Sequence, residues 1–387
     1  MIASLIRKFI PRHLSEPLKD LYVNTALIHF GTSLFSLFEP IYFHKLGFSI
    51  AEILLFYGAF FALCFFMSPL GGKFVLRYGH QRSLILSSLL EIVYYASLFA
   101  LGITPLALPI ALIANAANHT FYWPAFHFEY AQFGRDQESG REVSARVVLE
   151  IIADALAPFL GGLILILSSF TVLFIVASLV MLLSCIPLLF DRTVIEVHHF
   201  PYVDAMRRMF SALKWRFVLA MTGNAELISL RVLWPLFLFL FLGSNPFTLG
   251  SLVGVSSLVT MLAVLYIGRL ADHKNKRSIL KPTTLLYALS WWLRPFLPSL
   301  GGIFIADMSS RLTHTILQVP QLALVYERGR SRHHTMRTAV LYEMSTLLGR
   351  LLFIAVAFSI FIFFSTAVAW PMVFVLTGFV SLLYLLQ

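Results

Sequence analysis

The sequence predicts an all-α polytopic membrane protein with twelve transmembrane helices in two pseudo-symmetric halves of six. Hydrophobic residues make up 59% of the 387-residue chain, charged residues make up only 12%, and the mean hydropathy is +0.83. A soluble core of this size would not need so much apolar surface. The apolar residues also form twelve runs that approach the length of about 20 residues needed to cross a bilayer. Such long uninterrupted runs exclude a β-barrel.

The first half, residues 1–190, begins with a short apolar and basic stretch that we expect to lie at the membrane interface. It lacks the long apolar core and small-residue cleavage site of a signal peptide. Glu39 and Pro40 end the first span, and Pro105 and Pro109 open the fourth. The six predicted spans cover about residues 20–43, 49–69, 83–103, 105–130, 147–168 and 170–190.

Residues 191–215 form the predicted linker between the halves. Pro201 can begin a helix, and apolar residues recur after it at helical spacing, at Val203, Met206, Phe210 and Leu213. This pattern predicts a helix on the cytoplasmic membrane face; the alternative is an ordinary solvated linker. The second half, residues 216–387, has predicted spans at about 216–242, 246–267, 279–297, 301–326, 338–363 and 366–386.

The positive charges are distributed unevenly along the chain. Of the 29 lysines and arginines, 24 fall in the termini, in alternate loops or at the span ends beside those loops, and the others are Lys45, Arg231, Arg294, Arg311 and Arg350. By the positive-inside rule, this asymmetry predicts that both termini lie in the cytoplasm. We expect the protein to lie in the cell (inner or plasma) membrane. The net charge of +10 therefore indicates topology and attraction to anionic lipid, and not nucleic-acid binding.

Several short sequences recur with a nearly constant offset. The basic loop from Gly72 to Leu84 returns as the loop from Gly268 to Leu280, an offset of 268 − 72 = 196 residues. Three further echoes have offsets of 193 to 195 residues: His119 with His314, Pro40 with Pro235, and Glu150 with Glu343. These echoes indicate a duplicated architecture. An even number of spans in each half makes the repeat parallel, about an axis along the membrane normal.

The second of these loops resembles the loop after the second span of each half in the major facilitator superfamily, whose pattern is Gly-x-Leu-Ala-Asp-Arg-x-Gly-Arg-Lys. The residues that fit are Gly268, Leu270, Ala271, Asp272, Lys276 and Arg277, and in the first loop Gly72, Arg77 and Gly79. Leu76 stands where the family has the aspartate. The resemblance implies that Asp272 takes part in a gating latch, which is weaker in the first half.

Polar side chains at membrane depth are costly, so each is a candidate site. In the tenth span they share one helix face: Asp307, Arg311, His314, Gln318 and Gln321. Further candidates are His29 in the first span, Asn115, Asn118, His119, Tyr122 and Trp123 in the fourth, and Asn224, Glu226 and Arg231 in the seventh. By resemblance to the family, these four spans line a central substrate cavity. Arg231 and Arg311 could bind an anionic substrate group, or Asp307 and Arg311 could form a structural ion pair.

Proton coupling needs a group that changes protonation at accessible pH. The candidates are Asp154, Glu150 and Glu343, together with Glu226, Asp307, His119 and His314 in the cavity spans. Asp154 is followed by Ala157, Pro158, Gly161 and Gly162, which resembles the fifth-span Gly-Pro-x-x-Gly-Gly pattern of antiporters of the same superfamily. The resemblance favours export in exchange for protons; the alternative is a small-residue packing face. We expect Trp291 and Trp292 to be membrane-interface anchors.

Together these observations predict a secondary transporter that moves a small molecule by alternating access. We expect it to be coupled to protons, and antiport is the favoured mode of coupling. The alternative within this class is a symporter or uniporter for a sugar or an organic anion. Outside it stand a non-transporting sensor and a membrane-embedded enzyme. The chain has no His-Glu-x-x-His, Gly-x-Ser-x-Gly or nucleotide-binding glycine loop. We therefore expect no enzyme activity, no cofactor and no metal, and we expect a functional monomer.

Overall fold

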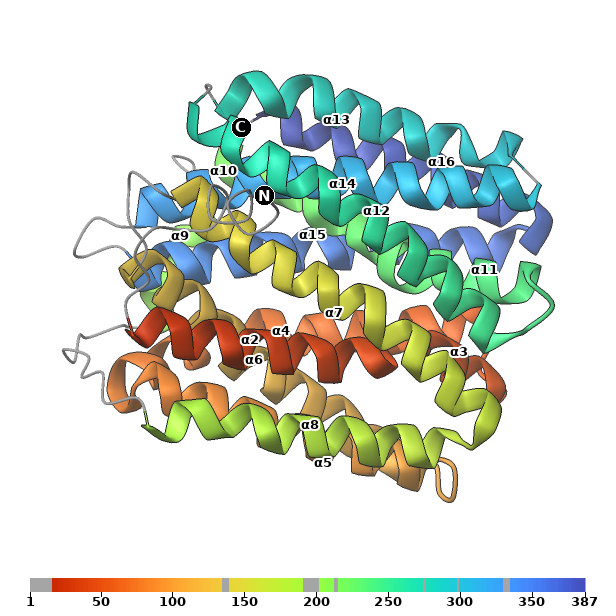
Figure 1. Ribbon diagram of the computed structural model, residues 1–387, viewed down its shortest axis with the longest axis horizontal. Helices are drawn as coiled ribbons and strands as arrows, with labels where there is room; N and C mark the ends of the chain where they lie inside the picture. The colour runs from red at the N-terminus through yellow and green to blue at the C-terminus, as the bar shows by residue number, and fades with distance from the viewer. Residues whose placement is uncertain are drawn as a thin grey trace, which may run out of the picture.

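The computed structural model describes residues 16–133, 139–190, 202–211, 215–273, 276–297, 299–329 and 335–386. These residues form a bundle of long helices, in which the first half lies in the lower part of Figure 1 and the second half in the upper part. The short helix α9 (Tyr202–Met209) lies at one end of the bundle, and α3 and α11 lie at the opposite end.

The helices follow the predicted order of spans. In the first half they are α2 (Glu16–Ser36), α3 (Glu39–Lys45), α4 (Ile50–Tyr78), α5 (His80–Leu101), α6 (Ala107–Phe133), α7 (Ser139–Leu167) and α8 (Phe170–Phe190). In the second half they are α10 (Trp215–Thr222), α11 (Trp234–Phe241), α12 (Pro246–His273), α13 (Lys276–Trp292), α14 (Leu300–Gly329), α15 (Thr335–Phe363) and α16 (Thr366–Ser381). Because α2 with α3, and α10 with α11, each make one crossing, the described helices cross the bundle twelve times, as predicted.

Two of these crossings are interrupted, and in both a proline stands just after the interruption. The first crossing breaks after Ser36, and α3 restarts at Glu39 with Pro40 in its first turn. The seventh passes through a 3-10 turn, Gly223–Glu226, and a π-helical turn, Ser229–Leu233, before α11 begins with Pro235 in its first turn. Proline lacks an N–H group, so it is well suited to the first turn of a restarted helix, where N–H groups have no partner within the helix. π-helical turns are frequent at functional sites. The sequence predicted both spans but not their interruptions.

Seven of the crossings are long and apolar enough, within the described part of the chain, to span a membrane by composition alone. The described parts of α6 and α14 are long enough but not apolar enough to be among these seven, and they supply many of the polar side chains of the candidate site described below. Their lower hydropathy is the expected result of facing the protein interior instead of lipid.

The two halves meet closely along α7 with α12 and along α4 with α15. Gly250 of α12 lies against the backbone oxygen of Pro158 in α7, and Gly162 lies against the backbone of Pro246, so that no side chain fits at either glycine. At the second interface, Gly72 faces Met336 and Val340. Small residues permit this close approach of helix backbones. The fifth-span small residues therefore have a packing role in the contact between the halves.

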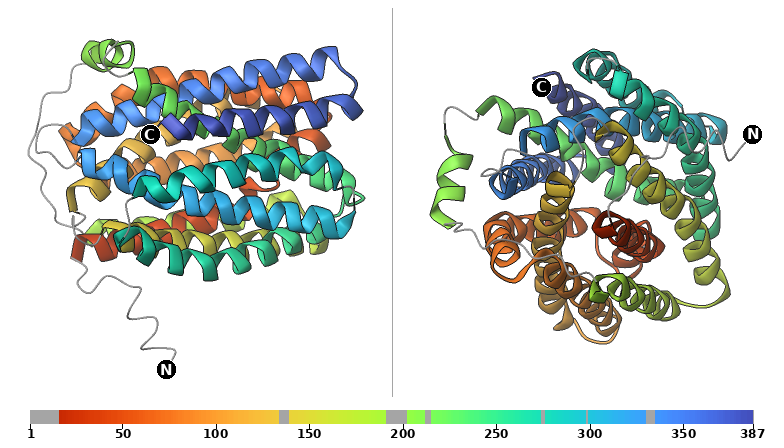
Figure 2. Two further views of the ribbon diagram at one scale, coloured as in Figure 1. Left: turned by 90° about the horizontal axis from the view of Figure 1, so that it is seen from above. Right: turned by 60° about the vertical axis from the view of Figure 1, so that its left-hand side comes forward.

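The short helix α9 begins one residue after Pro201 and lies on the outside of the bundle (Figure 2). Asp204 and Arg208 form an i, i+4 ion pair with 3.0 Å between the carboxylate and Nε. Met209 is buried, whereas Val203 and Phe210 are exposed. Leu213, the last residue of the predicted apolar stripe, lies outside the described residues. Exposed apolar side chains beside charged ones fit the predicted helix at a membrane surface.

Candidate functional site

Three adjoining cavities of about 270, 240 and 90 Å³ lie between the two halves. We call them the first, second and third cavity in that order. His29 of α2 and Arg231 of the π-helical turn line all three, so the cavities form one polar region around these two residues. A volume of this order accommodates a small molecule.

The wall contributed by the first half contains the predicted candidates of α2 and α6. His29, Asn115, Asn118, His119, Tyr122 and Trp123 all line the first cavity. The imidazole of His119 is edge-on to Phe60, and Trp123 stacks on His127 with 5.4 Å between ring centres. Among the described residues, His119 Nε2 has no hydrogen-bond partner. This wall therefore offers aromatic faces together with polar groups.

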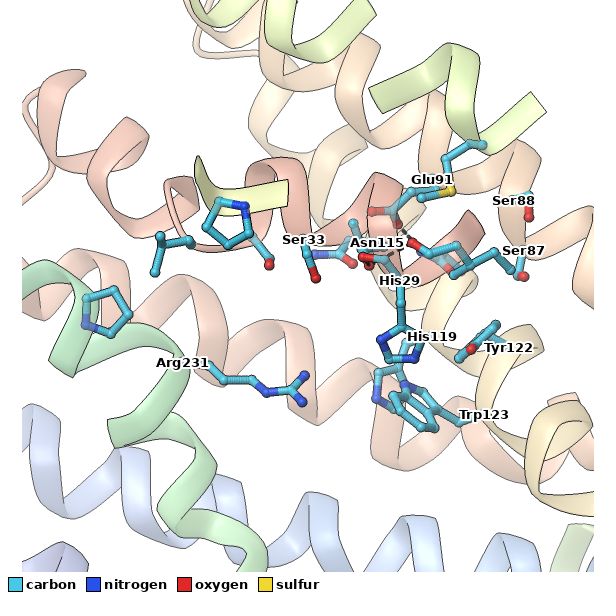
Figure 3. A pocket seen from close by; sticks show the side chains of 18 of the residues that line it. His29, Ser33, Ser87, Ser88, Glu91, Asn115, His119, Tyr122, Trp123 and Arg231 are labelled. Atoms are coloured by element: carbon cyan, nitrogen blue, oxygen red, sulfur yellow. Dashed lines mark hydrogen bonds between the residues drawn. The ribbon is translucent and has the colours of Figure 1, made fainter. Parts of the chain in front are cut away.

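Arg231 projects into the cavities from the opposite wall. Figure 3 shows its guanidinium pointing across the first cavity toward His119 and Trp123. Its side chain is exposed to the cavities, although the backbone of its π-helical turn is enclosed in the bundle. No carboxylate among the described residues lies within 4.0 Å of it. Arg231 is thus a positive charge that is available to a bound anion.

The aspartate of the tenth-span stripe is placed differently from the expectation. Asp307 is fully buried and lines none of the three cavities; its carboxylate accepts hydrogen bonds from Trp234 Nε1 at 2.9 Å and Arg311 Nε at 2.8 Å. Arg311 itself lines the first and third cavities. The spacing correctly placed both residues on one helix face, but that face is divided between the cavity and the neighbouring α11. An ion pair between Asp307 and Arg311 is therefore present.

Glu226 is also displaced from the predicted cavity wall into the interior of the second half. It is fully buried, accepts hydrogen bonds from Tyr287 and Tyr384, and faces His314 Nε2 at 3.4 Å. His314 lines the third cavity, and Gln318 lines the second and third. The 3-10 turn that contains Glu226 directs its carboxylate away from the cavities, which regular helical spacing did not predict.

Two of the three predicted coupling carboxylates pair with histidines. Glu150 faces His29 Nε2 at 3.3 Å, and Glu343 of α15 faces His127 Nε2 of α6 at 2.8 Å. Glu150 lines the second and third cavities, and Glu343 lines the second. The side chain of Asp154 lies outside the described residues.

Two glutamates and two arginines of the interior were not assigned a role from the sequence. Glu39 lines the second cavity and accepts a hydrogen bond from Tyr94 at 2.6 Å, and Glu91 lines the first and accepts one from Asn118. In the sequence, each of these two glutamates is visible only as a single acidic residue inside an apolar run, and neither belongs to a row of charged residues at helical spacing. Arg350 lines the second cavity and donates to Asn224 at 2.7 Å. The fourth, Arg294, belongs to an aromatic cluster.

That cluster corrects the expectation for Trp291. Arg294 Cζ lies 3.3 Å from the ring centre of Trp291 and 3.8 Å from that of Trp234, and Nη2 donates to Ser310 at 2.7 Å. Trp291 is fully buried, so it is not a membrane-interface anchor. It faces inward because its ring encloses a buried guanidinium. Trp292 is partly exposed and donates to the backbone oxygen of Val375 at 3.1 Å.

The predicted gating loops are described only in the first half. Gly79 has a φ of 96° and forms the turn between α4 and α5, while Arg77 is exposed and lies over the Tyr78 ring. Leu76, which replaces the family aspartate, is buried. The side chains of the second copy, Gly268, Asp272, Lys276 and Arg277, lie outside the described residues.

Comparisons with known proteins identify the family and the fold. The model of the Major Facilitator Superfamily matches residues 21–244. The crystal structure of the human organic anion transporter MFSD10 (TETRAN) superposes with a TM-score of 0.71 at 14% identity, covering 97% of this chain and 100% of that one. At this identity the likeness shows the fold. No curated protein matches the sequence.

Proposed function

Because the chain belongs to the major facilitator superfamily, we propose that this secondary transporter carries an organic anion across the membrane together with a proton. Membership of the family makes it a multi-pass membrane transporter and not an enzyme. The nature of the substrate, the coupling to protons and the direction of movement are our proposals.

The proposal of an anionic substrate rests mainly on the position of Arg231. Its guanidinium is exposed to all three cavities and has no acidic partner within 4.0 Å among the described residues, whereas Arg311 is already bonded to Asp307. A carboxylate or phosphate beside Arg231 would gain charge-assisted hydrogen bonds. The aromatic side chains of Tyr122 and Trp123 line the same cavity and suit the apolar part of an organic anion. The printed name of the similar human structure, an organic anion transporter, supports the same class.

The proposed mechanism is alternating access between the halves 1–190 and 216–387, joined by the linker 191–215. The cavities lie between these halves, as a site near the pseudo-symmetry axis of the family requires. We place the linker and both termini on the cytoplasmic side of the cell membrane by the positive-inside rule, and we propose that a monomer completes the cycle.

Co-transport is favoured over the antiport that the fifth-span resemblance suggested. Pro158, Gly162 and the facing Gly250 are accounted for by close helix packing, so they do not require an antiport mechanism. One observation favours a second candidate, exchange of an organic cation for protons: the carboxylates of Glu39 and Glu91 line the cavities without a basic partner. Both nevertheless accept hydrogen bonds from neighbouring side chains. Arg231, in contrast, has no carboxylate within 4.0 Å among the described residues.

The test is flux into liposomes that contain the purified full-length protein and an internal pH indicator. Benzoate, succinate, glucose and tetraphenylphosphonium are added in turn, with and without an acid exterior. We expect benzoate or succinate to enter faster with an acid exterior and to carry protons inward. Arg231→Ala should abolish this flux and Arg231→Lys should retain part of it. Arg207→Ala, which removes an exposed arginine of α9, is the matched control.

Other outcomes would contradict the proposal. Entry of tetraphenylphosphonium in exchange for protons would establish the cation antiporter, and entry of glucose alone would establish a sugar carrier. Anion flux that ignores the proton gradient would leave the substrate class standing and remove proton coupling.

A further inference from the structure

Two carboxyl groups of the first half differ from every other glutamate of the cavity region. Glu39 is the first residue of α3, and Glu91 lies near the middle of α5. Tyr94 donates to Glu39 at 2.6 Å and Tyr57 also faces it, while Asn118 and Tyr95 face Glu91. Glu91 is buried, and Glu39 is partly buried. Both carboxyl groups are thus held by neutral hydrogen-bond donors.

The other glutamates of this region face histidines. Glu150, Glu343 and Glu226 lie 3.3, 2.8 and 3.4 Å from the Nε2 atoms of His29, His127 and His314. Within the described part of the chain, no arginine, lysine or histidine nitrogen comes within 4.0 Å of Glu39 or Glu91. Protonating Glu150 or Glu343 would disrupt a pair with histidine, whereas protonating Glu39 or Glu91 would disrupt none.

The surroundings of Glu39 and Glu91 give a physical reason why these carboxyl groups would bind a proton. A buried carboxylate without a cationic partner is costly, and a bound proton removes that cost. Tyr94, which donates to Glu39, follows Glu91 by about one turn of α5, so the two carboxyl groups lie in the same region and a proton on either one relieves repulsion between like charges. The groups facing the pair from neighbouring elements are Tyr57 of α4, Tyr94 and Tyr95 of α5, Asn118 and His119 of α6, and His29 and Arg231 across the cavities.

We propose that Glu39 and Glu91 together carry the proton that moves with the substrate, in place of the carboxylates predicted from the sequence. This inference rests on the proposed proton coupling. A proton from cavity water adds to a carboxylate oxygen when the cavity is open to one side, and it leaves to water on the other side. In each transfer one O–H bond breaks and another forms: a hydronium ion of the cavity water gives the proton to the carboxylate, and the carboxyl group later returns it to a water molecule. Because Arg231 shares the first cavity with Glu91 and the second with Glu39, an anion bound at Arg231 favours the protonated state of the pair.

The experiment uses Glu39→Gln, Glu91→Gln and the double variant in full-length protein, with the anion that gives the largest flux in the panel above. Two fluxes are compared: accumulation driven by an acid exterior, and exchange of labelled for unlabelled anion without a proton gradient. We expect the double variant to lose accumulation and anion-triggered proton entry while it retains exchange. Glu52→Gln, which alters an exposed helix-capping carboxylate, should leave both fluxes unchanged.

A second measurement does not depend on the substrate. Infrared difference spectra of the purified protein between acid and alkaline buffer should contain the C=O band of a protonated carboxyl group, and this band should be reduced in each single variant and lost in the double variant. The inference fails if the double variant still couples, if it loses exchange as completely as accumulation, or if only Glu343→Gln removes coupling. If the parent protein itself moves no protons with its substrate, the proposed coupling fails instead.

Discussion

His127 of the first half and Glu343 of the second meet across the boundary between them. The imidazole Nε2 lies 2.8 Å from the carboxylate oxygen, and the two side chains are only 4% and 6% exposed. Within the described part of the chain, no other ion pair joins the two halves. Tyr342 packs edge-on against the histidine ring, with 5.1 Å between ring centres. The pair is therefore placed to hold the halves together.

We predict that Glu343→Gln loosens the contact between α6 and α15. Removing one partner of a buried ion pair costs about 3–5 kcal/mol, and this cost falls on the conformation in which the halves touch here. In a background without Cys64 and Cys185, a cysteine at Ser36, which lines the first and second cavities, should react faster with a charged thiol reagent. Unchanged reactivity from both sides of the membrane would show that the pair does not control access.

Gly250→Ala should damage the contact between α7 and α12. A Cβ atom at this position would collide with the backbone oxygen of Pro158, and an overpacked interface costs about 1–3 kcal/mol. We expect lower thermal stability and slower transport. Gly301→Ala is the matched control because it meets nothing within 4 Å and alanine favours helix. Equal effects of the two substitutions would contradict a specific role for Gly250.

Arg294→Met should destabilise the second half without direct effect on the cavities, because Arg294 lines none of them. The guanidinium lies between Trp234 and Trp291 and donates to Ser310. Loss of a desolvated cation–π contact costs about 2 kcal/mol, so we expect a lower unfolding temperature in a thermal-shift measurement. Substitution of the exposed Arg82 by methionine should leave that temperature unchanged.

Asp307→Asn separates the structural role of the Asp307–Arg311 pair from a role in transport. Asparagine can still accept from Trp234, but it removes the carboxylate that pairs with Arg311 Nε. We expect a loss of stability that the double variant Asp307→Asn with Arg311→Gln partly restores, since replacing both members of a buried pair is less damaging than removing one. A double variant that is as unstable as the single one would show that the charge pair is not what stabilises this region.

The sequence was sufficient for the number and order of the spans, because hydropathy and charge asymmetry are properties of the chain alone. The residues of α2 and α6 that it proposed for a substrate cavity line the first cavity of the structure. Helical spacing could not tell whether a polar face looks into a cavity or against another helix, and so Asp307 and Glu226 were misplaced. The break before α3 and the two irregular turns near Arg231 depend on tertiary packing, which overrides local propensity. Trp291 faces inward because of Arg294, a partner that repeat and motif patterns do not reveal.

The π-helical turn Ser229–Leu233 determines in which direction the side chains of the seventh crossing point around its axis. A hydrogen bond that closes over five residues instead of four accommodates one residue more than an α-helical turn, so the segments on either side are rotated relative to each other. Asn224 and Trp234 can therefore each face their own neighbours while Arg231 points to the centre. Deleting one residue from this turn would leave hydropathy and length almost unchanged, yet it would turn the guanidinium away from the substrate path.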